Sequence, residues 1–213
     1  LTRSEISDIV EDFRRGAANA IAAGFDGVEV HGANGYLVDQ FLRQSANQRT
    51  DEYGGSLENR TRFLREVLDA VTAEIGSERT GLRLSPLNSF NSMKEEDPVR
   101  WIQYLGEILN PYDLAYLHVM RADFFGLQKA DVIPAVRDVY NGHLMVNMGY
   151  SAEEAAELIS HQGADSVAFG TAFLANPDLP ERIKAGAELN EPDPSTFYTS
   201  GAEGYTDYPA MSR

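Results

Sequence analysis

The sequence predicts an α/β fold of parallel strands and helices, and it favours a (β/α)₈ barrel over a doubly wound sheet. Five helix–strand repeats follow one another, at the roughly 30 to 40 residues per repeat that parallel strands with right-handed crossovers require. Nearly every expected strand ends in a residue with polar or glycine character. The residues at the strand ends are His31, Ser85, His118, Asn147 and Gly170. A doubly wound sheet concentrates its functional site at one switch point, whereas a barrel builds its site from several strand ends.

The first helix and strand are marked by capping residues and by apolar spacing. Apolar residues recur at helical spacing over residues 6–21. Thr2 with Glu5 three residues later forms a capping box before them, and Gly24 closes the helix. Residues 27–31 then read as a strand.

A polar connection over residues 45–55 leads to the second helix. Ser56 is its N-cap, the apolar face extends to Ile75, and Gly76 ends it. The next strand is expected at residues 82–85.

The third helix begins at Asp97-Pro98, which has the chemistry of an N-cap followed by a proline in the first turn. Pro111 stops this helix, and residues 114–120 read as a strand. A helix around residues 132–139 precedes a strand at 144–147.

The last repeat is signalled by a second capping pair. Ser151 with Glu154 caps a helix, Gly163 precedes a strand at residues 166–169, and a short helix starts near Asp178.

Composition excludes several classes of function. A net charge of −15 argues against nucleic acid and anionic membranes as partners, because both repel an acidic surface. The chain has no cysteine, which excludes disulfides and cysteine-ligated clusters, and its four histidines lie far apart, so no metal is expected. No apolar run approaches the roughly 20 residues of a membrane span. We therefore expect a cytoplasmic protein acting on small molecules, and the 213 residues suit a single domain.

Strand parity predicts which side chains face the barrel interior. Side chains alternate across a strand, so Val28 and Val30 share one face while Glu29 and His31 share the other. The valines belong against the helices. Arg83 has the same inward parity on the next strand, and we predict that Glu29 and Arg83 form an ion pair. The alternative role for Glu29 is simple neutralisation of a buried arginine.

Seven segments closely resemble the Old Yellow Enzyme family of FMN-dependent ene-reductases. They occur in the same order as in that family and run to the end of the chain, so the resemblance extends over almost its whole length. They are residues 31–37, 47–60, 82–86, 90–93, 147–150, 169–179 and 204–209.

The resemblance implies the C-terminal part of one FMN-binding barrel domain. Residues 1–213 would supply strands 4 to 8, with residues 186–213 as a tail, and a missing N-terminal segment or separate chain would supply the first three strands. The family carries a hydride from NADH or NADPH to FMN and then to the β-carbon of an α,β-unsaturated carbonyl compound, so an enone or enal substrate is implied.

Three residues match the catalytic set of that family. His31 and Asn34 match the pair that donates hydrogen bonds to the substrate carbonyl oxygen, where enolate charge develops. Tyr36 matches the proton donor to the α-carbon, a task that suits a phenol. The structural alternative for each is a buried polar residue satisfied by backbone, and the longer motif around the trio favours the catalytic role.

The resemblance also implies a flavin site. Arg83 matches the cation near the flavin N1 and O2, and the phosphate would lie at Met148, Gly149, Gly170 and Thr171, in the loops after the seventh and eighth strands. Many relatives carry arginine where this chain has Thr171. Weaker FMN retention is therefore expected.

Two further residues match positions that line the substrate pocket. These residues are Asn91 and Tyr198. For a single residue in a loop, a purely structural role is nearly as good an explanation.

Two other functions remain open. The chain could be an inactive half-barrel that serves as a binding or assembly module, although the intact set of catalytic residues favours the enzyme. A weaker option is an unrelated phosphate-binding barrel enzyme, which would leave the tyrosine-rich tail unexplained.

Overall fold

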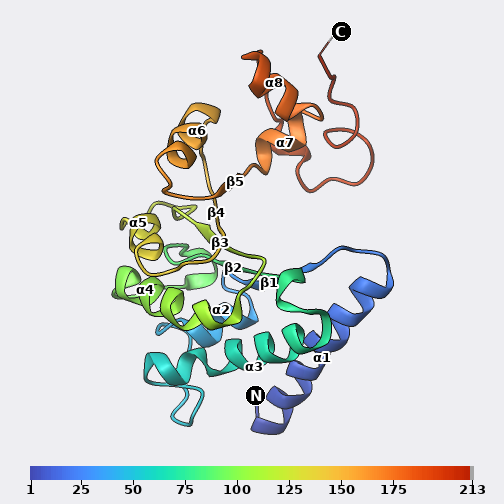
Figure 1. Ribbon diagram of the computed structural model, residues 1–213. Helices are drawn as coiled ribbons and strands as arrows, with labels where there is room; N and C mark the ends of the chain where they lie inside the picture. The colour runs from blue at the N-terminus through green and yellow to red at the C-terminus, as the bar shows by residue number, and fades with distance from the viewer. Residues whose placement is uncertain (212–213) are drawn as a thin grey trace.

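The structure, a computed structural model, describes residues 1–211 and is built around one parallel sheet. Its five strands lie in the order in which they occur in the sequence (Figure 1). This order never reverses, as it must in a doubly wound sheet, so the sheet is an arc of a barrel. The strands are β1 (Val28–Gly32), β2 (Thr80–Leu84), β3 (Tyr116–Met120), β4 (Leu144–Asn147) and β5 (Ser166–Ala168).

The helices agree with the expected order, and their caps form as predicted. Thr2 and Ser151 each make a full capping box, while Ser56 and Asp97 each accept a backbone N–H three residues on. The helices are α1 (Arg3–Ala22), α2 (Leu37–Leu42), α3 (Leu57–Ile75), α4 (Pro98–Leu109), α5 (Val132–Arg137), α6 (Ala152–Ser160), α7 (Thr171–Ala175) and α8 (Leu179–Ala185).

The sequence did not predict α2 and α7. They are six and five residues long and follow directly after residues 31–36 and after Gly170. Helices of this length carry too few apolar positions to show a period.

The core lies between the sheet and the helices. Val30, Leu82 and Leu84 are buried on the helix side, where they join α3 and α4 in one apolar cluster. Glu29, His31 and Arg83 alternate with them and are less buried. The predicted parity of the first two strands is confirmed.

The predicted ion pair between Glu29 and Arg83 is wrong. In the register of β1 and β2, Glu29 lies opposite Gly81, and Arg83 lies opposite His31. The space beside Gly81 is filled by the Tyr116 ring of β3, and the Glu29 carboxylate also contacts β3, where its Oε2 lies 2.9 Å from His118 Nδ1. Burial and the nearby Glu29 also raise the pKa of Tyr116 on β3 to about 12.

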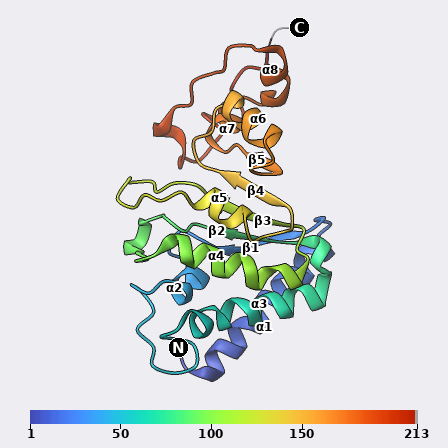
Figure 2. The same ribbon diagram turned by 60° about the vertical axis from the view of Figure 1, so that its left-hand side comes forward.

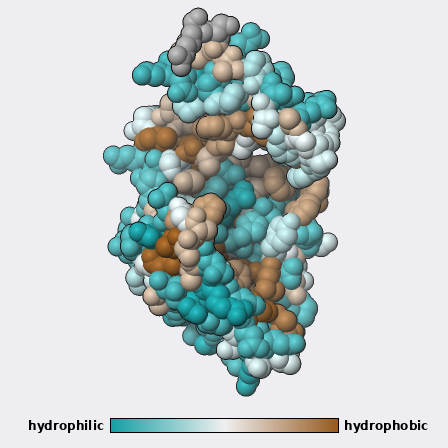
Figure 3. Space-filling view, turned by 90° about the vertical axis from the view of Figure 1, so that its right-hand side faces the viewer, coloured by the Kyte–Doolittle hydropathy of each residue, from teal (hydrophilic) through white to brown (hydrophobic). Residues whose placement is uncertain are grey.

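The helices α6 to α8 and the tail stand apart from the α1–α4 body at the far end of the sheet (Figure 2). The molecule is hollowed between these two parts on the face shown in Figure 3, with hydrophilic and hydrophobic residues around the hollow. β1 and β5 are the two edges of the sheet. None of the described helices is long and apolar enough to span a membrane.

Candidate active site

The turn that follows β1 is built from two residues in the left-handed region. Asn34 has φ 59° and Gly35 has φ 71°. A Cβ on Gly35 would lie 2.5 Å from the Cβ of Asn91, so only glycine fits against this neighbour. Asn91 Nδ2 donates to the carbonyl oxygen of Asn34 at 3.1 Å. The predicted pocket residue Asn91 therefore also holds the turn that carries Asn34.

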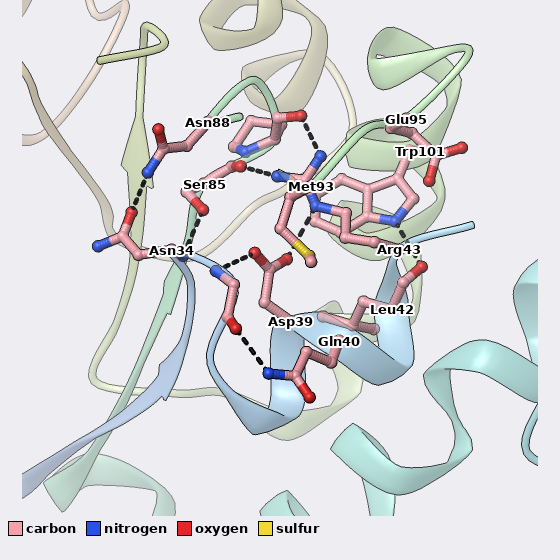
Figure 4. A network of polar contacts seen from close by, with 12 residues as sticks. Asn34, Asp39, Gln40, Leu42, Arg43, Ser85, Asn88, Met93, Glu95 and Trp101 are labelled. Atoms are coloured by element: carbon pink, nitrogen blue, oxygen red, sulfur yellow. Dashed lines mark hydrogen bonds and ion pairs between the residues drawn. The ribbon is translucent and has the colours of Figure 1, made fainter. Parts of the chain in front are cut away.

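The orientation of the Asn34 side chain is set by its neighbours (Figure 4). The backbone N–H of Asn34 donates to Ser85 Oγ at 2.8 Å, and Asn88 Nδ2 donates to Asn34 Oδ1 at 2.6 Å. Since the amide oxygen already accepts, the NH₂ group is the end of the side chain that points away from the network. It donates to no other described residue, so the Asn34 amide keeps a free hydrogen-bond donor.

A buried ion pair between Asp39 and Arg43 stabilises this turn. Asp39 Oδ2 accepts from the Gly35 N–H at 2.9 Å, and Asp39 Oδ1 accepts from Arg43 Nε at 2.8 Å. Both side chains are fully buried, and Arg43 also donates to the carbonyl oxygens of Ser85 and Pro86 (Figure 4). This pair was not predicted from the sequence. The signal that could have indicated it is the Asp–Arg spacing of four in a mostly apolar stretch.

His31 and Tyr36 lie on either side of the same turn. Their ring centroids are 5.1 Å apart at an interplanar angle of 50°. Burial and the charge of Arg83 lower the pKa of His31, which favours the neutral imidazole with its one N–H. Tyr36 is 55% exposed and precedes α2. The turn thus gathers the three predicted catalytic side chains at one strand end.

Arg83 faces the barrel interior with an unused donor. It is half-buried beside His31, and its Nε is buried without a hydrogen-bond partner among the described residues. Burial lowers the pKa of Arg83, which Glu29 opposes, and a guanidinium still stays charged at neutral pH. An inward-facing cation with a free N–H suits an anionic, planar acceptor such as a reduced flavin.

Two more buried polar atoms on the next strands lack partners within the described chain. They are His118 Nε2 on β3 and Asn147 Oδ1 on β4. Both residues stood out earlier only as polar strand ends, because sequence alone does not show which of their atoms the fold leaves unpaired. Unpaired buried polar atoms are costly unless a ligand or water meets them.

The predicted phosphate loops lie after β4 and β5. Met148 has φ 91° and Gly149 has φ 70°. Gly170 precedes α7, whose first residue is Thr171. A Cβ on Gly149 or Gly170 would meet nothing within 4 Å, so both loops leave open space at their backbones. Their role in binding a phosphate stays a prediction.

Tyr198 lies in the tail beyond α8. Its side chain is 98% exposed in the tail. Its place in a substrate pocket stays a prediction.

Comparison with known protein families gives a match over most of the chain. Residues 1–190 match the NADH:flavin oxidoreductase / NADH oxidase family. A probable flavin mononucleotide-dependent alkene reductase of Leishmania infantum is 57% identical over 99% of the chain, and 12-oxophytodienoate reductase 1 of Oryza sativa subsp. japonica is 50% identical over the same share. The chain spans 58% and 57% of these two relatives.

Solved structures agree with the sequence relatives. The old yellow enzyme of Trypanosoma cruzi superposes with a TM-score of 0.98 at 44% identity, over 100% of this chain and 57% of its own. Morphinone reductase superposes with a TM-score of 0.94 at 46% identity, over 99% of this chain and 57% of its own. The chain therefore spans a little more than half the length of the proteins it matches.

Proposed function

Since this chain belongs to the NADH:flavin oxidoreductase / NADH oxidase family, we propose that it supplies the substrate-activating part of an FMN-dependent ene-reductase. The substrate is an α,β-unsaturated carbonyl compound, and the reductant is NADH or NADPH. The names of the alkene reductase and of the 12-oxophytodienoate reductase among its relatives support this class of reaction.

The observation that carries the proposal is the arrangement of donors at Asn34 and His31. Asn88 occupies the amide oxygen of Asn34, so its NH₂ group is held as a donor. His31 offers a ring N–H from the same strand end, and burial and Arg83 lower its pKa. Two fixed donors at a carbonyl oxygen stabilise the negative charge that develops there when the β-carbon accepts a hydride.

Tyr36 completes the reaction by delivering a proton. It adjoins His31 and is exposed on the same turn, so it can approach the α-carbon of a bound enone. A phenol stays protonated at neutral pH yet can transfer its proton to a developing carbanion.

Residues of this chain fit an FMN group. Arg83 would lie against the ring edge with its unpaired Nε, and Met148, Gly149, Gly170 and Thr171 would surround the phosphate. Thr171 would contribute a hydroxyl where many relatives have arginine. When bound, FMN supplies the hydride-transfer chemistry that the side chains lack.

The complete site requires a closed barrel. β1 and β5 are the edges of the sheet, and each leaves a row of backbone donors and acceptors without a neighbouring strand. An apolar cavity of about 420 Å³ lies along the free side of β1, lined by α1 and β1. We propose that three further strands, in the same polypeptide or in a second one, close the barrel here.

Steady-state kinetics of the flavin-loaded barrel test the catalytic assignment. Asn34→Ala or His31→Ala should lower kcat/KM for 2-cyclohexen-1-one by about 10²-fold or more, because each removes one donor to the developing enolate. Asn110→Ala is the matched control. The side-chain oxygen of Asn110, like that of Asn34, accepts a hydrogen bond, here from the Asn141 N–H, but Asn110 lies before β3 at the opposite end of the strands. Unchanged kcat/KM in Asn34→Ala would contradict the assignment, and a protein that never retains flavin would favour the binding-module alternative.

A further inference from the structure

We propose that Arg121 is a positioning residue for the FMN phosphate, which acts by holding the loop after β4 without contacting the cofactor. The inference rests on the proposed function, because it concerns the same flavin site. Arg121 directly follows β3, and its backbone N–H donates to the carbonyl oxygen of Asn147 at the end of β4. Arg121 therefore connects the end of β3 to the end of β4, where the loop after β4 begins.

The side chain of Arg121 is fully engaged by that loop. Its Nε donates to the carbonyl oxygen of Met148 at 2.9 Å, and its Nη2 donates to that of Gly149 at 2.6 Å. The guanidinium also pairs with Glu154 at 3.2 Å and stacks on the Tyr150 ring, 3.6 Å from the centroid. These contacts fix three consecutive residues and the first turn of α6.

The conformation that Arg121 holds is one that the loop would not favour alone. Met148 has a φ of 91°, a strained value for a residue with a Cβ, and such residues persist only when their surroundings fix them. With the two carbonyl groups turned to Arg121, the backbone N–H groups of Gly149 and Tyr150 make no hydrogen bond to any described residue. The loop is therefore preorganised with free donors, as phosphate binding requires.

The guanidinium itself is not available to a phosphate. Its donors are used by two carbonyl oxygens and by the Glu154 carboxylate, and one of its faces lies on Tyr150. Glu154 also accepts the Ser151 N–H in the capping box of α6, so the network is continuous with the helix cap. Because position 171 supplies only a hydroxyl here, the backbone donors that Arg121 orients carry more of the phosphate affinity.

Ligand titration of the flavin-free, complete barrel tests this role. Arg121→Met should weaken FMN binding about ten-fold or more, since it removes two charge-assisted hydrogen bonds to the loop. Riboflavin has the same ring without the phosphate, and its dissociation constant should stay within about two-fold, because the loop contributes little to it. Arg121→Lys should lose most of the FMN affinity too, because one ammonium cannot reproduce the bidentate fork and the stacking.

Arg137→Met is the matched control. Arg137 also joins carbonyl oxygens, those of Tyr140 and Gly142, to a carboxylate, that of Asp165, but it lies before β4 at the other end of the strand. Its replacement should leave the ratio of FMN to riboflavin affinity unchanged.

Three results would overturn the inference alone: wild-type FMN affinity in Arg121→Met, an equal loss of FMN and riboflavin affinity, or full retention by Arg121→Lys. The equal loss would indicate general destabilisation, and retention by lysine would show that charge alone suffices. A wild-type protein that binds neither FMN nor riboflavin would overturn the proposed function together with this inference.

Discussion

At the scale of single residues, a few hydrogen bonds orient the turn from His31 to Tyr36 and the side chain of Asn34. Asn34 is oriented by Asn88 and Ser85, and the turn itself is held by the Asp39 carboxylate, which accepts the Gly35 N–H. The sequence could indicate the identity of the donors through the motif. It could not indicate their partners, because these lie 51 or more residues away for Asn34.

Tyr36 gives a prediction that separates the two halves of the reaction. Tyr36→Phe should slow reoxidation of the reduced flavin by 2-cyclohexen-1-one about 10²-fold, because the α-carbon loses its proton donor. Reduction of the flavin by NADPH or NADH needs no such proton and should be unaffected. Stopped-flow absorbance under anaerobic conditions measures each step. Equal rates of reoxidation in Tyr36→Phe and wild type would show that the proton has another source.

Glu29 shows the limit of prediction from parity. The inward parity of Glu29 and Arg83 follows from alternation along each strand, and it is correct. Their pairing also depends on the offset between two strands, and the register places Gly81 opposite Glu29. Since that offset is a property of the assembled sheet, the partner on β3, His118, could not be predicted from either strand.

At the scale of elements, the loops after β2 and β3 are joined by one carboxylate. Asp123 accepts from the backbone and side chain of Ser89 and from the backbone N–H groups of Phe125 and Leu127. Burial raises the pKa of Asp123, but these hydrogen bonds outweigh burial, and the net pKa lies below its usual value. The loop after β2, which contains Asn91, and the loop after β3 are thus held in one unit.

This carboxylate predicts a pH dependence of stability. A carboxyl whose folded pKa is depressed contributes stability above its unfolded pKa of about 4, and this contribution is lost as pH falls through the folded pKa. Asp123→Asn should therefore lower the free energy of unfolding at pH 7 by about 2 kcal/mol and by less below pH 4. Urea unfolding at both pH values measures this.

The control for Asp123 is an aspartate on the surface. Asp26→Asn alters an exposed side chain and should leave the free energy of unfolding unchanged at both pH values. A loss in Asp123→Asn that is the same at pH 7 and below pH 4 would contradict the charge-based account.

Elements were predictable to the extent that local chemistry defines them. The capping residues Thr2, Ser56, Asp97 and Ser151 indicated four helix starts, because an N-cap acts within three residues of itself. The strands β2 and β3 each begin two residues away from the predicted start, because pairing with neighbouring strands decides where a strand begins.

At the scale of the whole molecule, the sheet is an arc with two free edges. The sequential, parallel order of five strands is the order of a barrel, and solved relatives superpose on it over about 57% of their length. The repeat spacing and the polar strand ends predicted this architecture. The closure of the barrel, by contrast, depends on strands that these residues do not include.

We propose above that His31, Asn34 and Tyr36 activate an enone for reduction by FMN. The most direct test is an anaerobic titration of the protein with a complete barrel, followed by its visible absorption spectrum. We predict a bound flavin that NADPH or NADH bleaches and that 2-cyclohexen-1-one restores stoichiometrically, with the restoration slowed about 10²-fold or more in Asn34→Ala. A flavin that is bleached by the nicotinamide but stays reduced in the presence of the enone would contradict the account.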